Sequence, residues 1–539
     1  MDLSSASSDL GQAGLSTRVR ALIGAAIVLG GALILMLPSL YNGMPFVLWD
    51  TPSYLSVAKL VLAADPTAVI VTLENDPALI ATPPTQAERQ ELLAAAASHL
   101  GARRVGYSLF LERGLEWISF WGVAFLQCLA VSAALYLALS AIWGAELRAW
   151  KFLALCAGVA LLTSGGIVAS LMMPDIFGSV LLLLLAWLFT VLPNRTSAIS
   201  AAVFLALVLI LSIHRAHAPL SIAVMIAGVI VVWLRGIPLR GVVKPVALLF
   251  GAMVGGAVLN AGLNAFAERA MGMPFEQPPF LMARAIDDGA GRRYLETSCD
   301  PAGFEICKFK DRLLKQYFWP GNTALFHNDV AEGGLYMIES LEVRKRLREQ
   351  QAAFAREAIL AYPLDQLRGS AKNILKLLLT ARMNGPLSDP SFSYQGYAGH
   401  RGWLGNSVLL DAVPGVEVCK QIPQAFCGNV DFKIVSWLFY GGYLLGAAAL
   451  AWIALGFIAR HRLSFSRLDR VDTFILLILI GVVMNAVVMG ILGGEYSRLQ
   501  TRVNWLWPAL AMAVALLSPE KILSPRAMLA SWRARQASR

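Results

Sequence analysis

The sequence predicts an all-α membrane protein, a bundle of about ten transmembrane helices with a large exterior loop domain. Of its 539 residues, 57% are hydrophobic and only 15% are charged, against about 25% in a typical soluble protein. Its mean hydropathy is +0.61. Because the basic residues cluster in short segments between apolar runs, the net charge of +10 indicates membrane topology, and we expect no nucleic-acid partner.

Ten segments are long and apolar enough to be transmembrane helices, which need about 20 mostly apolar residues. The first, at 19–40, is interpreted as an anchor, because it is too long for a signal peptide and no small-residue cleavage site follows it. The pair at 151–170 and 176–192 requires a tight hairpin at "LMMPDIFG". The other expected spans are 116–143, 197–213, 218–234, 243–265, 432–458, 472–493 and 503–518.

Lysines and arginines between the spans predict the orientation, because they are enriched in cytoplasmic segments. With the N-terminus in the cytoplasm, the cytoplasmic segments hold seventeen basic residues, and the short exterior segments hold three. Both termini are then cytoplasmic. The exterior three are Arg215, Arg498 and Arg502.

Two long segments, 41–115 and 266–431, are exterior in this topology. The chain then divides into an N-terminal transmembrane module of about seven spans at 1–265, which includes the first exterior loop, and an exterior loop domain at 266–431. A C-terminal module of about three spans with a basic cytoplasmic tail follows at 432–539.

Four of the six cysteines form two close pairs in the second exterior loop, Cys299 with Cys307 and Cys419 with Cys427. An exterior, oxidising location permits disulfides, and two local bridges are favoured among the three possible connectivities. Zinc binding is the alternative, but seven residues between the thiolates do not match the usual ligand spacing.

The segment "LDQLRGSAKNILKLLL" at 364–379 has an apolar stripe at helical spacing. Such a helix either lies in the membrane interface or packs on the core of its own loop domain. The stripe consists of Leu364, Leu367, Ala371, Ile374, Leu375 and Leu378, and Lys372 and Lys376 lie beside it.

Ionisable residues stand at the exterior end of several spans, where charged groups are functional candidates. Simpler roles stay open for each of them: a helix cap for either aspartate, an ordinary interfacial position for the histidines, and nonspecific lipid binding for the arginines. The candidates are Asp50, Asp175, His214, Arg215, His217, Glu495, Arg498 and Arg502.

The spacing of Arg498 and Arg502 predicts a phosphate site. Four residues apart, they share one face of a helix, with Glu495 three residues earlier on the same side. Two guanidiniums suit a phosphate or pyrophosphate, because each binds in a bidentate manner. A carboxylate opposite them suits deprotonation of a hydroxyl group. The pattern indicates group transfer from a lipid phosphate to a hydroxyl acceptor.

This layout resembles the GT-C superfamily of integral-membrane glycosyltransferases. The resemblance is carried by "LWDTPSYL", with an acidic residue after the first span, by "MPDIF", and by "HRAHAP" and "EYSRLQTRVNWLWP". It implies catalytic roles for Asp50 and Asp175 and phosphate binding by the exterior histidines and arginines. Asp50 has no acidic neighbour, so the resemblance leaves open whether a divalent metal ion joins the two aspartates.

The resemblance further implies an inverting enzyme in a bacterial inner membrane, surrounded by membrane lipids. Its donor would be a sugar linked to polyprenyl phosphate, and its acceptor a hydroxyl group of a glycan, lipid or protein. Two alternatives remain: an O-antigen polymerase or ligase, in which Asp50 would matter little, and a lipid-linked-glycan transporter. A transporter would have ionisable residues or broken helices at mid-membrane, whereas these spans are nearly free of charge at their centres.

Overall fold

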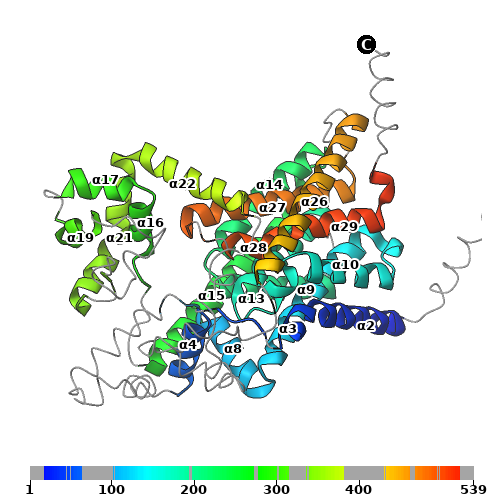
Figure 1. Ribbon diagram of the computed structural model, residues 1–539, viewed down its shortest axis with the longest axis horizontal. Helices are drawn as coiled ribbons and strands as arrows, with labels where there is room; N and C mark the ends of the chain where they lie inside the picture. The colour runs from blue at the N-terminus through cyan, green and yellow to red at the C-terminus, as the bar shows by residue number, and fades with distance from the viewer. Residues whose placement is uncertain are drawn as a thin grey trace, which may run out of the picture.

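The computed structural model confirms an all-helical protein over the part of the chain that it describes (Figure 1). Outside its helices it contains one isolated parallel bridge, between Phe46 and Leu171. The described residues are 17–63 apart from 44 and 49, 101–192 apart from 102, 197–271, 277–314 apart from 300–302, 335–380 apart from 337 and 338, 430–461 apart from 431, and 468–522 apart from 495 and 497.

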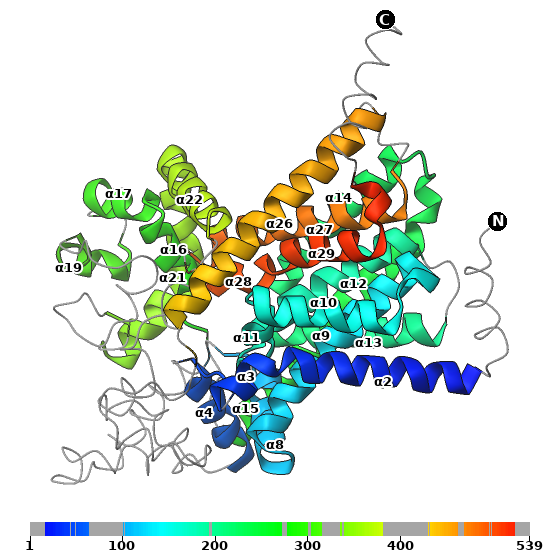
Figure 2. The ribbon, with the colours of Figure 1, turned by 45° about the vertical axis from the view of Figure 1, so that its right-hand side comes forward.

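Long apolar helices run side by side and form a bundle (Figures 1 and 2). They lie close to the ten expected segments. The bundle helices are α2 (Thr17–Leu35), α9 (Phe120–Trp143), α10 (Ala149–Leu162), α12 (Phe177–Val191), α13 (Ala198–Ile213), α14 (His217–Leu234), α15 (Val243–Met271), α26 (Phe432–His461), α27 (Arg470–Leu492) and α29 (Leu506–Leu517).

Seven helices of the described chain are long and apolar enough to cross a membrane, which supports a multi-pass membrane protein. The expected number of ten is not confirmed. The helix α10 has 14 residues, α13 has 16 and α29 has 12. At 1.5 Å per residue they span only about 18–24 Å, less than the roughly 30 Å of a bilayer core. The expected span at 151–170 ends earlier, because α10 stops at Leu162 before the separate helix α11 (Gly165–Ala169).

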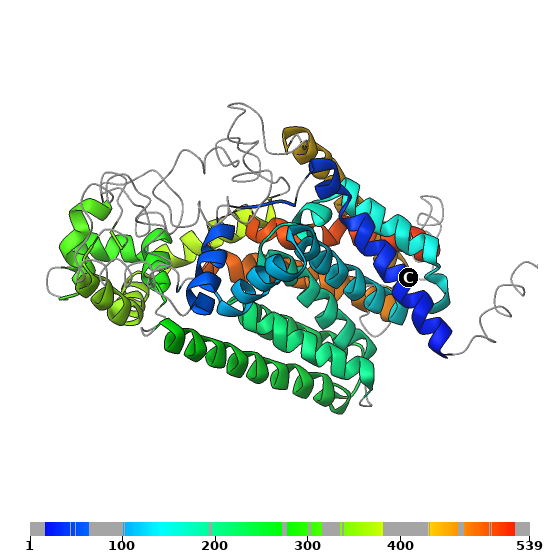
Figure 3. The same cartoon turned by 90° about the horizontal axis from the view of Figure 1, so that it is seen from below.

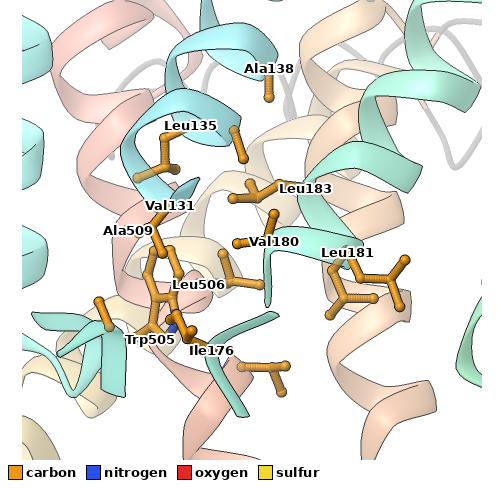
Figure 4. Packing of buried hydrophobic residues seen from close by; sticks show 14 of the residues in the cluster. Val131, Leu135, Ala138, Ile176, Val180, Leu181, Leu183, Trp505, Leu506 and Ala509 are labelled. Carbon is orange, nitrogen blue, oxygen red and sulfur yellow. The ribbon is translucent and has the colours of Figure 1, made fainter. Parts of the chain in front are cut away.

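The helix α12 occupies the centre of the bundle. Every one of its residues from 178 to 190 is buried, as expected for a helix that is apolar all round. Side chains of α9, of the segment leading into α12 and of the C-terminal helices meet around it (Figure 4). Those labelled in the figure are Val131, Leu135, Ala138, Ile176, Val180, Leu181, Leu183, Trp505, Leu506 and Ala509.

The outer helices present apolar side chains to the surroundings. The long helix α15 forms one edge of the bundle, where Figure 3 shows it in green. Its Phe250 is 61% exposed and its Val258 66% exposed. On α26, Leu445 is 74% exposed. A soluble protein rarely exposes such continuous apolar surface, so these faces fit contact with lipid.

Polar contacts tie helix ends together at one end of the bundle. The indole N–H of Trp143, at the end of α9, donates to Ser518 at 2.7 Å, just after α29. Asp469 and Asp472 cap the start of α27 reciprocally, and Lys521 forms ion pairs with both. Three short helices lie here: η1 (Gly144–Glu146), η3 (Leu239–Gly241) and η7 (Pro519–Lys521).

The other end of the bundle, which we call the α28 end, holds more of the short elements. There α3 (Leu37–Asn42) follows α2, α4 (Thr51–Ala63) follows a short loop, and α8 (Val105–Trp117) precedes α9. The turn η2 (Pro174–Ile176) leads into α12, and α28 (Arg498–Asn504) leads into α29.

Part of the loop domain has a small hydrophobic core of its own, beside the bundle in Figure 1. Buried side chains such as Met282, Leu295 and Phe354 form it. The predicted bridge between Cys299 and Cys307 is present, whereas Cys419 and Cys427 lie outside the described residues. The helices are α16 (Phe280–Asp287), α17 (Ala290–Thr297), η4 (Glu305–Phe309), α19 (Lys310–Leu314), α21 (Leu341–Ala361) and α22 (Pro363–Leu378).

We predict that replacing Cys299 and Cys307 together by serine lowers the stability of the loop domain by about 2–3 kcal/mol, the chain-entropy value for such a short loop. Thermal unfolding followed by limited proteolysis of the purified protein measures this loss. Replacing the buried, unpaired Cys156 by alanine is a control that leaves the loop domain unchanged. Free thiols at both 299 and 307 in unreduced peptides would contradict the bridge.

Candidate functional site

The loop that carries Asp50 is bound to the loop that carries Asp175. The backbone N–H of Phe46 donates to the carbonyl of Ser170 at 3.2 Å, and the N–H of Met172 donates back to Phe46 at 2.9 Å. The hydroxyl of Thr51 donates to the carbonyl of Met172 at 3.1 Å. These contacts hold the two acidic loops side by side at the α28 end.

Gln127, buried in the middle of an apolar helix, supports the same pair of loops. Its amide N–H groups donate to the carbonyls of Ala169 at 3.2 Å and Leu171 at 2.7 Å. Its carbonyl accepts a hydrogen bond from the hydroxyl of Tyr107 in α8 at 2.9 Å. Buried polar groups need such partners, so Gln127 fixes α8 and the second acidic loop to α9.

Asp50 lies in the turn before α4 and contacts two arginines. Its Oδ2 is 2.6 Å from Nη2 of Arg498, the first residue of α28, and its Oδ1 forms an ion pair with Arg103, just before α8. One carboxylate therefore joins three segments that are far apart in the chain. Burial alone would lower the pKa of Arg498. The negative charges of Asp50 and Asp175 outweigh this effect and raise that pKa above its usual value.

Asp175 is buried in η2, and its Oδ1 lies 3.8 Å from Nη1 of Arg502. The cap position of α12 is occupied by Ile176, so Asp175 does not cap that helix. The fully buried Arg502 also donates from Nη2 to Asn485 at 2.8 Å. A side chain on Gly178 would reach within 3.3 Å of the Arg502 Nε, so this glycine leaves room for the guanidinium.

Two amides hold α28 in place against α27. Asn485 in the middle of α27 donates to the carbonyl of Leu499 and to the side chain of Gln500, both at 2.8 Å. Gln500 donates in turn to the carbonyl of Val482 at 3.2 Å and to Asn504 at 2.8 Å. The arginines therefore project from a short helix whose amide side chains are hydrogen-bonded.

The histidine segment lies at the same end. His217 is buried, and its Nδ1 donates to the carbonyl of Ile210 at 2.7 Å. Its ring lies 4.9 Å from that of His214. Burial, the neighbouring His217 and the positive charge of Arg502 together lower the pKa of His214 well below its usual value, so this ring is neutral at pH 7.

Arg215 is a further arginine at the α28 end of the bundle. Its guanidinium lies 4.1 Å from the ring centre of Phe280. Burial and the nearby charges of Arg104 and Arg103 lower its pKa to about 10. It is therefore still charged at neutral pH.

Tyr54 lies within electrostatic reach of every charged group of this cluster. Burial raises its pKa to about 12, so the phenol stays protonated. Among the described residues, five arginines and two aspartates surround it, which gives these groups an excess of positive charge. We call the following residues the arginine site: Asp50, Arg103, Arg104, Asp175, His214, Arg215, Arg498 and Arg502.

Several buried donors of the arginine site lack a protein acceptor. Nη1 of Arg498 and both Nε and Nη1 of Arg502 make no hydrogen bond, although Nη1 of Arg502 lies 3.8 Å from Asp175. The acceptor Nε2 of the buried His217 makes none either. Native proteins leave few buried polar groups unpaired, because each such group costs about 1–3 kcal/mol. Unpaired guanidinium groups beside an excess of positive charge fit an anion with several oxygen atoms, such as a phosphate.

The structure thus brings most of the site residues predicted from the sequence to one end of the bundle. They are Asp50, Asp175, Arg498, Arg502 and the "HRAH" segment. Glu495 lies outside the described residues. Sequence reasoning missed Arg103 and Arg104. It also missed the amides Gln127 and Asn485, although a single amide within an apolar span is a signal that could have found them.

Among the described residues, the carboxylates of the arginine site are paired with arginines rather than grouped with other potential metal ligands. Both aspartates contact arginines, and no group of three or more histidine, cysteine or acidic side chains suited to a metal occurs in the described part of the chain. Comparisons with protein families, with curated proteins and with solved structures found no match to this chain.

We predict that the free energy of unfolding decreases as the pH is lowered, and that His214 is one cause. The unfolded chain binds a proton on this histidine near pH 6.5, whereas the folded protein resists protonation because the pKa is lowered. Stability is therefore lost as the pH falls below about 6.5, by up to about 1.4 kcal/mol per pH unit. Melting temperatures between pH 7.5 and 5.5 should fall less steeply for His214→Gln. His461→Gln, at the far end of α26, is the control, and equal slopes for both variants would contradict the assignment.

Proposed function

We propose that this protein is an integral-membrane glycosyltransferase. It transfers a sugar from a polyprenyl-phosphate-linked donor to an acceptor hydroxyl at the exterior face of a bacterial inner membrane. The observation that carries the proposal is the arginine site itself, where buried guanidinium donors without acceptors lie beside two carboxylates at the end of a membrane bundle.

The exterior location of the arginine site is supported by the charge pattern. Most basic residues of the short connecting segments belong to the opposite end of the bundle, where Arg235 and Lys521 lie. The positive-inside rule then places that end, and both termini, in the cytoplasm. The α28 end faces the exterior, where polyprenyl-linked sugars and envelope acceptors meet.

Arg498 and Arg502 would bind the donor phosphate. Their unpaired N–H groups supply at least three donors, and the excess of positive charge favours an anion over a neutral ligand. When the bond between the anomeric carbon and the phosphate oxygen breaks, negative charge grows on the leaving polyprenyl phosphate. Preorganised guanidinium groups stabilise that charge more than the charge of the intact donor.

Asp50 would act as the general base, and the arginines control when it does so. Arg103 and Arg498 each contact one of its oxygen atoms, so both arginines compete with an acceptor hydroxyl for the carboxylate. A donor phosphate that draws Arg498 away removes this ion pair from Oδ2. The acceptor hydroxyl then attacks the anomeric carbon with inversion, its proton passes to Asp50, and polyprenyl phosphate leaves.

Asp175 has a different role in this proposal. It is buried next to Arg502 and contacts no other arginine of the described chain. We therefore assign it to positioning Arg502, together with Asn485, rather than to proton transfer. Its loss would misplace one half of the phosphate site.

The main alternative is an O-antigen polymerase or ligase. It would also use arginines and histidines to bind a lipid pyrophosphate, but it would not need Asp50 as a base. The contact of Asp50 with Arg498 favours the glycosyltransferase, because it puts a carboxylate beside the proposed phosphate. A transporter is less well supported, since the charged side chains of the arginine site lie at helix ends.

We expect Asp50→Asn to lower transfer activity by a factor of about 10²–10⁴, the usual contribution of a general base. The amide has nearly the same shape but cannot accept the proton. Transfer from a panel of polyprenyl-phosphate-linked sugars into an endogenous membrane acceptor measures this loss. Asp365→Asn is the matched control, because Asp365 also pairs with an arginine, at 3.2 Å, but in the loop domain. Full turnover by Asp50→Asn would exclude the base and favour the polymerase or ligase.

We expect Arg498→Lys and Arg502→Lys each to weaken donor binding and turnover by at least about tenfold, because lysine keeps the charge but loses the planar fork. Binding of a short-chain polyprenyl phosphate and transfer rates are measured for both variants. Arg293→Lys, which alters an ion pair of the loop domain, serves as the control. Unchanged kinetics for both site variants would rule out the phosphate clamp and leave nonspecific headgroup contact as their role.

A further inference from the structure

The helix α22 is folded with its polar side inward and much of its apolar side outward. Leu364 is 67% exposed, Leu367 64% and Leu375 58%, and Leu379, just after the helix, is 72% exposed. Ser370 and Asn373, by contrast, are buried. An amphipathic helix on a soluble domain normally buries its apolar stripe. Within the described residues, these leucines are therefore not covered by the core of the loop domain, unlike in one of the two interpretations of the sequence.

Hydrogen bonds fix this unusual orientation. Asp288, buried after α16, accepts from Gln366 at 2.6 Å, from Ser370 at 3.0 Å and from Asn373 at 2.8 Å. Arg284 forms an ion pair with the same carboxylate. Rotating α22 to bury its leucines would break the three hydrogen bonds that it donates and leave Arg284 as the partner of Asp288, which is destabilising for a buried carboxylate.

The contact with α27 places α22 at the level of the membrane boundary. A side chain on Gly490 would reach within 2.7 Å of Ile374, so the two helices touch closely, and Asn373 donates to the carbonyl of Gly490 at 3.4 Å. Gly490 is two residues before the end of the apolar helix α27 at Leu492. The C-terminal half of α22 thus lies beside the last turn of a membrane span, and the rest of the helix extends from there toward the loop domain (Figures 1 and 2).

Basic side chains run along one edge of the exposed leucines. Arg368, Lys372 and Lys376 are each exposed and are spaced one helical turn apart. An apolar stripe with a row of cations beside it is the arrangement by which a helix lies in a lipid headgroup layer and attracts anionic lipids.

We propose that α22 lies in the headgroup layer of the same membrane and binds anionic phospholipids. Its leucines enter the acyl region and its basic edge contacts headgroup phosphates. The helix also reaches the arginine site, because Asn504 of α28 donates to the carbonyl of Thr380, directly after α22, at 2.6 Å. Leu377 of α22 packs with Leu499 of α28. The bilayer surface thereby helps to hold α28 at headgroup level. This inference rests on the membrane location alone and would survive the loss of the glycosyltransferase proposal.

A nitroxide label on the full-length protein in nanodiscs tests the location of α22. The variant Leu367→Cys is labelled in a background in which Cys128 and Cys156 are alanine. We expect high accessibility to oxygen and low accessibility to a water-soluble nickel complex. The control Arg356→Cys, on an exposed position of α21, should show the opposite. A label at 367 that is reached by the nickel complex, or shielded from both reagents by protein, would overturn the proposal.

The basic edge is tested with the same label. The double variant Lys372→Gln, Lys376→Gln carries the same label at position 367. In nanodiscs that contain phosphatidylglycerol, these substitutions should move the label toward water and raise its accessibility to the nickel complex at least twofold. In nanodiscs of phosphatidylcholine alone, the double variant should match its parent. Lys345→Gln, an exposed lysine of α21, is the control and should have no effect in either lipid. An equal response in both lipids would overturn the binding of anionic lipid.

Discussion

The arrangement depends above all on the carboxylate of Asp50, which two arginines share. Arg103 comes from the segment before α8 and Arg498 from the start of α28, so one side chain connects the first loop to the last part of the bundle. Partly buried charges attract each other more strongly than charges in water, and removing one partner would leave the others uncompensated. The bound loops around Phe46 and the amide of Gln127 are the supports that keep this carboxylate in place.

The arginine site combines tight support with incomplete pairing. Its amides are well paired, since Asn485 and Gln500 bind each other and the backbone. Its guanidinium groups are not, since Arg498 and Arg502 keep buried donors without a protein acceptor. A purely structural ion-pair network would gain stability by satisfying those donors. Rigid support around unsatisfied cations is instead the pattern of a preorganised anion site.

The sequence was sufficient to place Asp50, Asp175 and the two arginines of α28 at one end of a bundle, because alternating spans leave few choices for where loops meet. It could not reveal Arg103, which is 53 residues from Asp50 and follows no periodic pattern. It also suggested ten full spans, whereas α10, α13 and α29 are shorter than a span, since apolar composition does not fix where a helix ends. The stripe of α22 was visible, but its outward orientation depends on the distant Asp288.

A structure of the protein in a nanodisc with bound polyprenyl phosphate tests the central claim most directly. The account predicts that the phosphate lies within hydrogen-bond distance of Arg498 and Arg502, with the polyprenyl chain along the bundle. It also predicts that Arg498 has moved away from Asp50, so that the ion pair between them is broken. A phosphate bound elsewhere, or one bound beside an unchanged contact between Asp50 and Arg498, would contradict the claim that the donor releases the base.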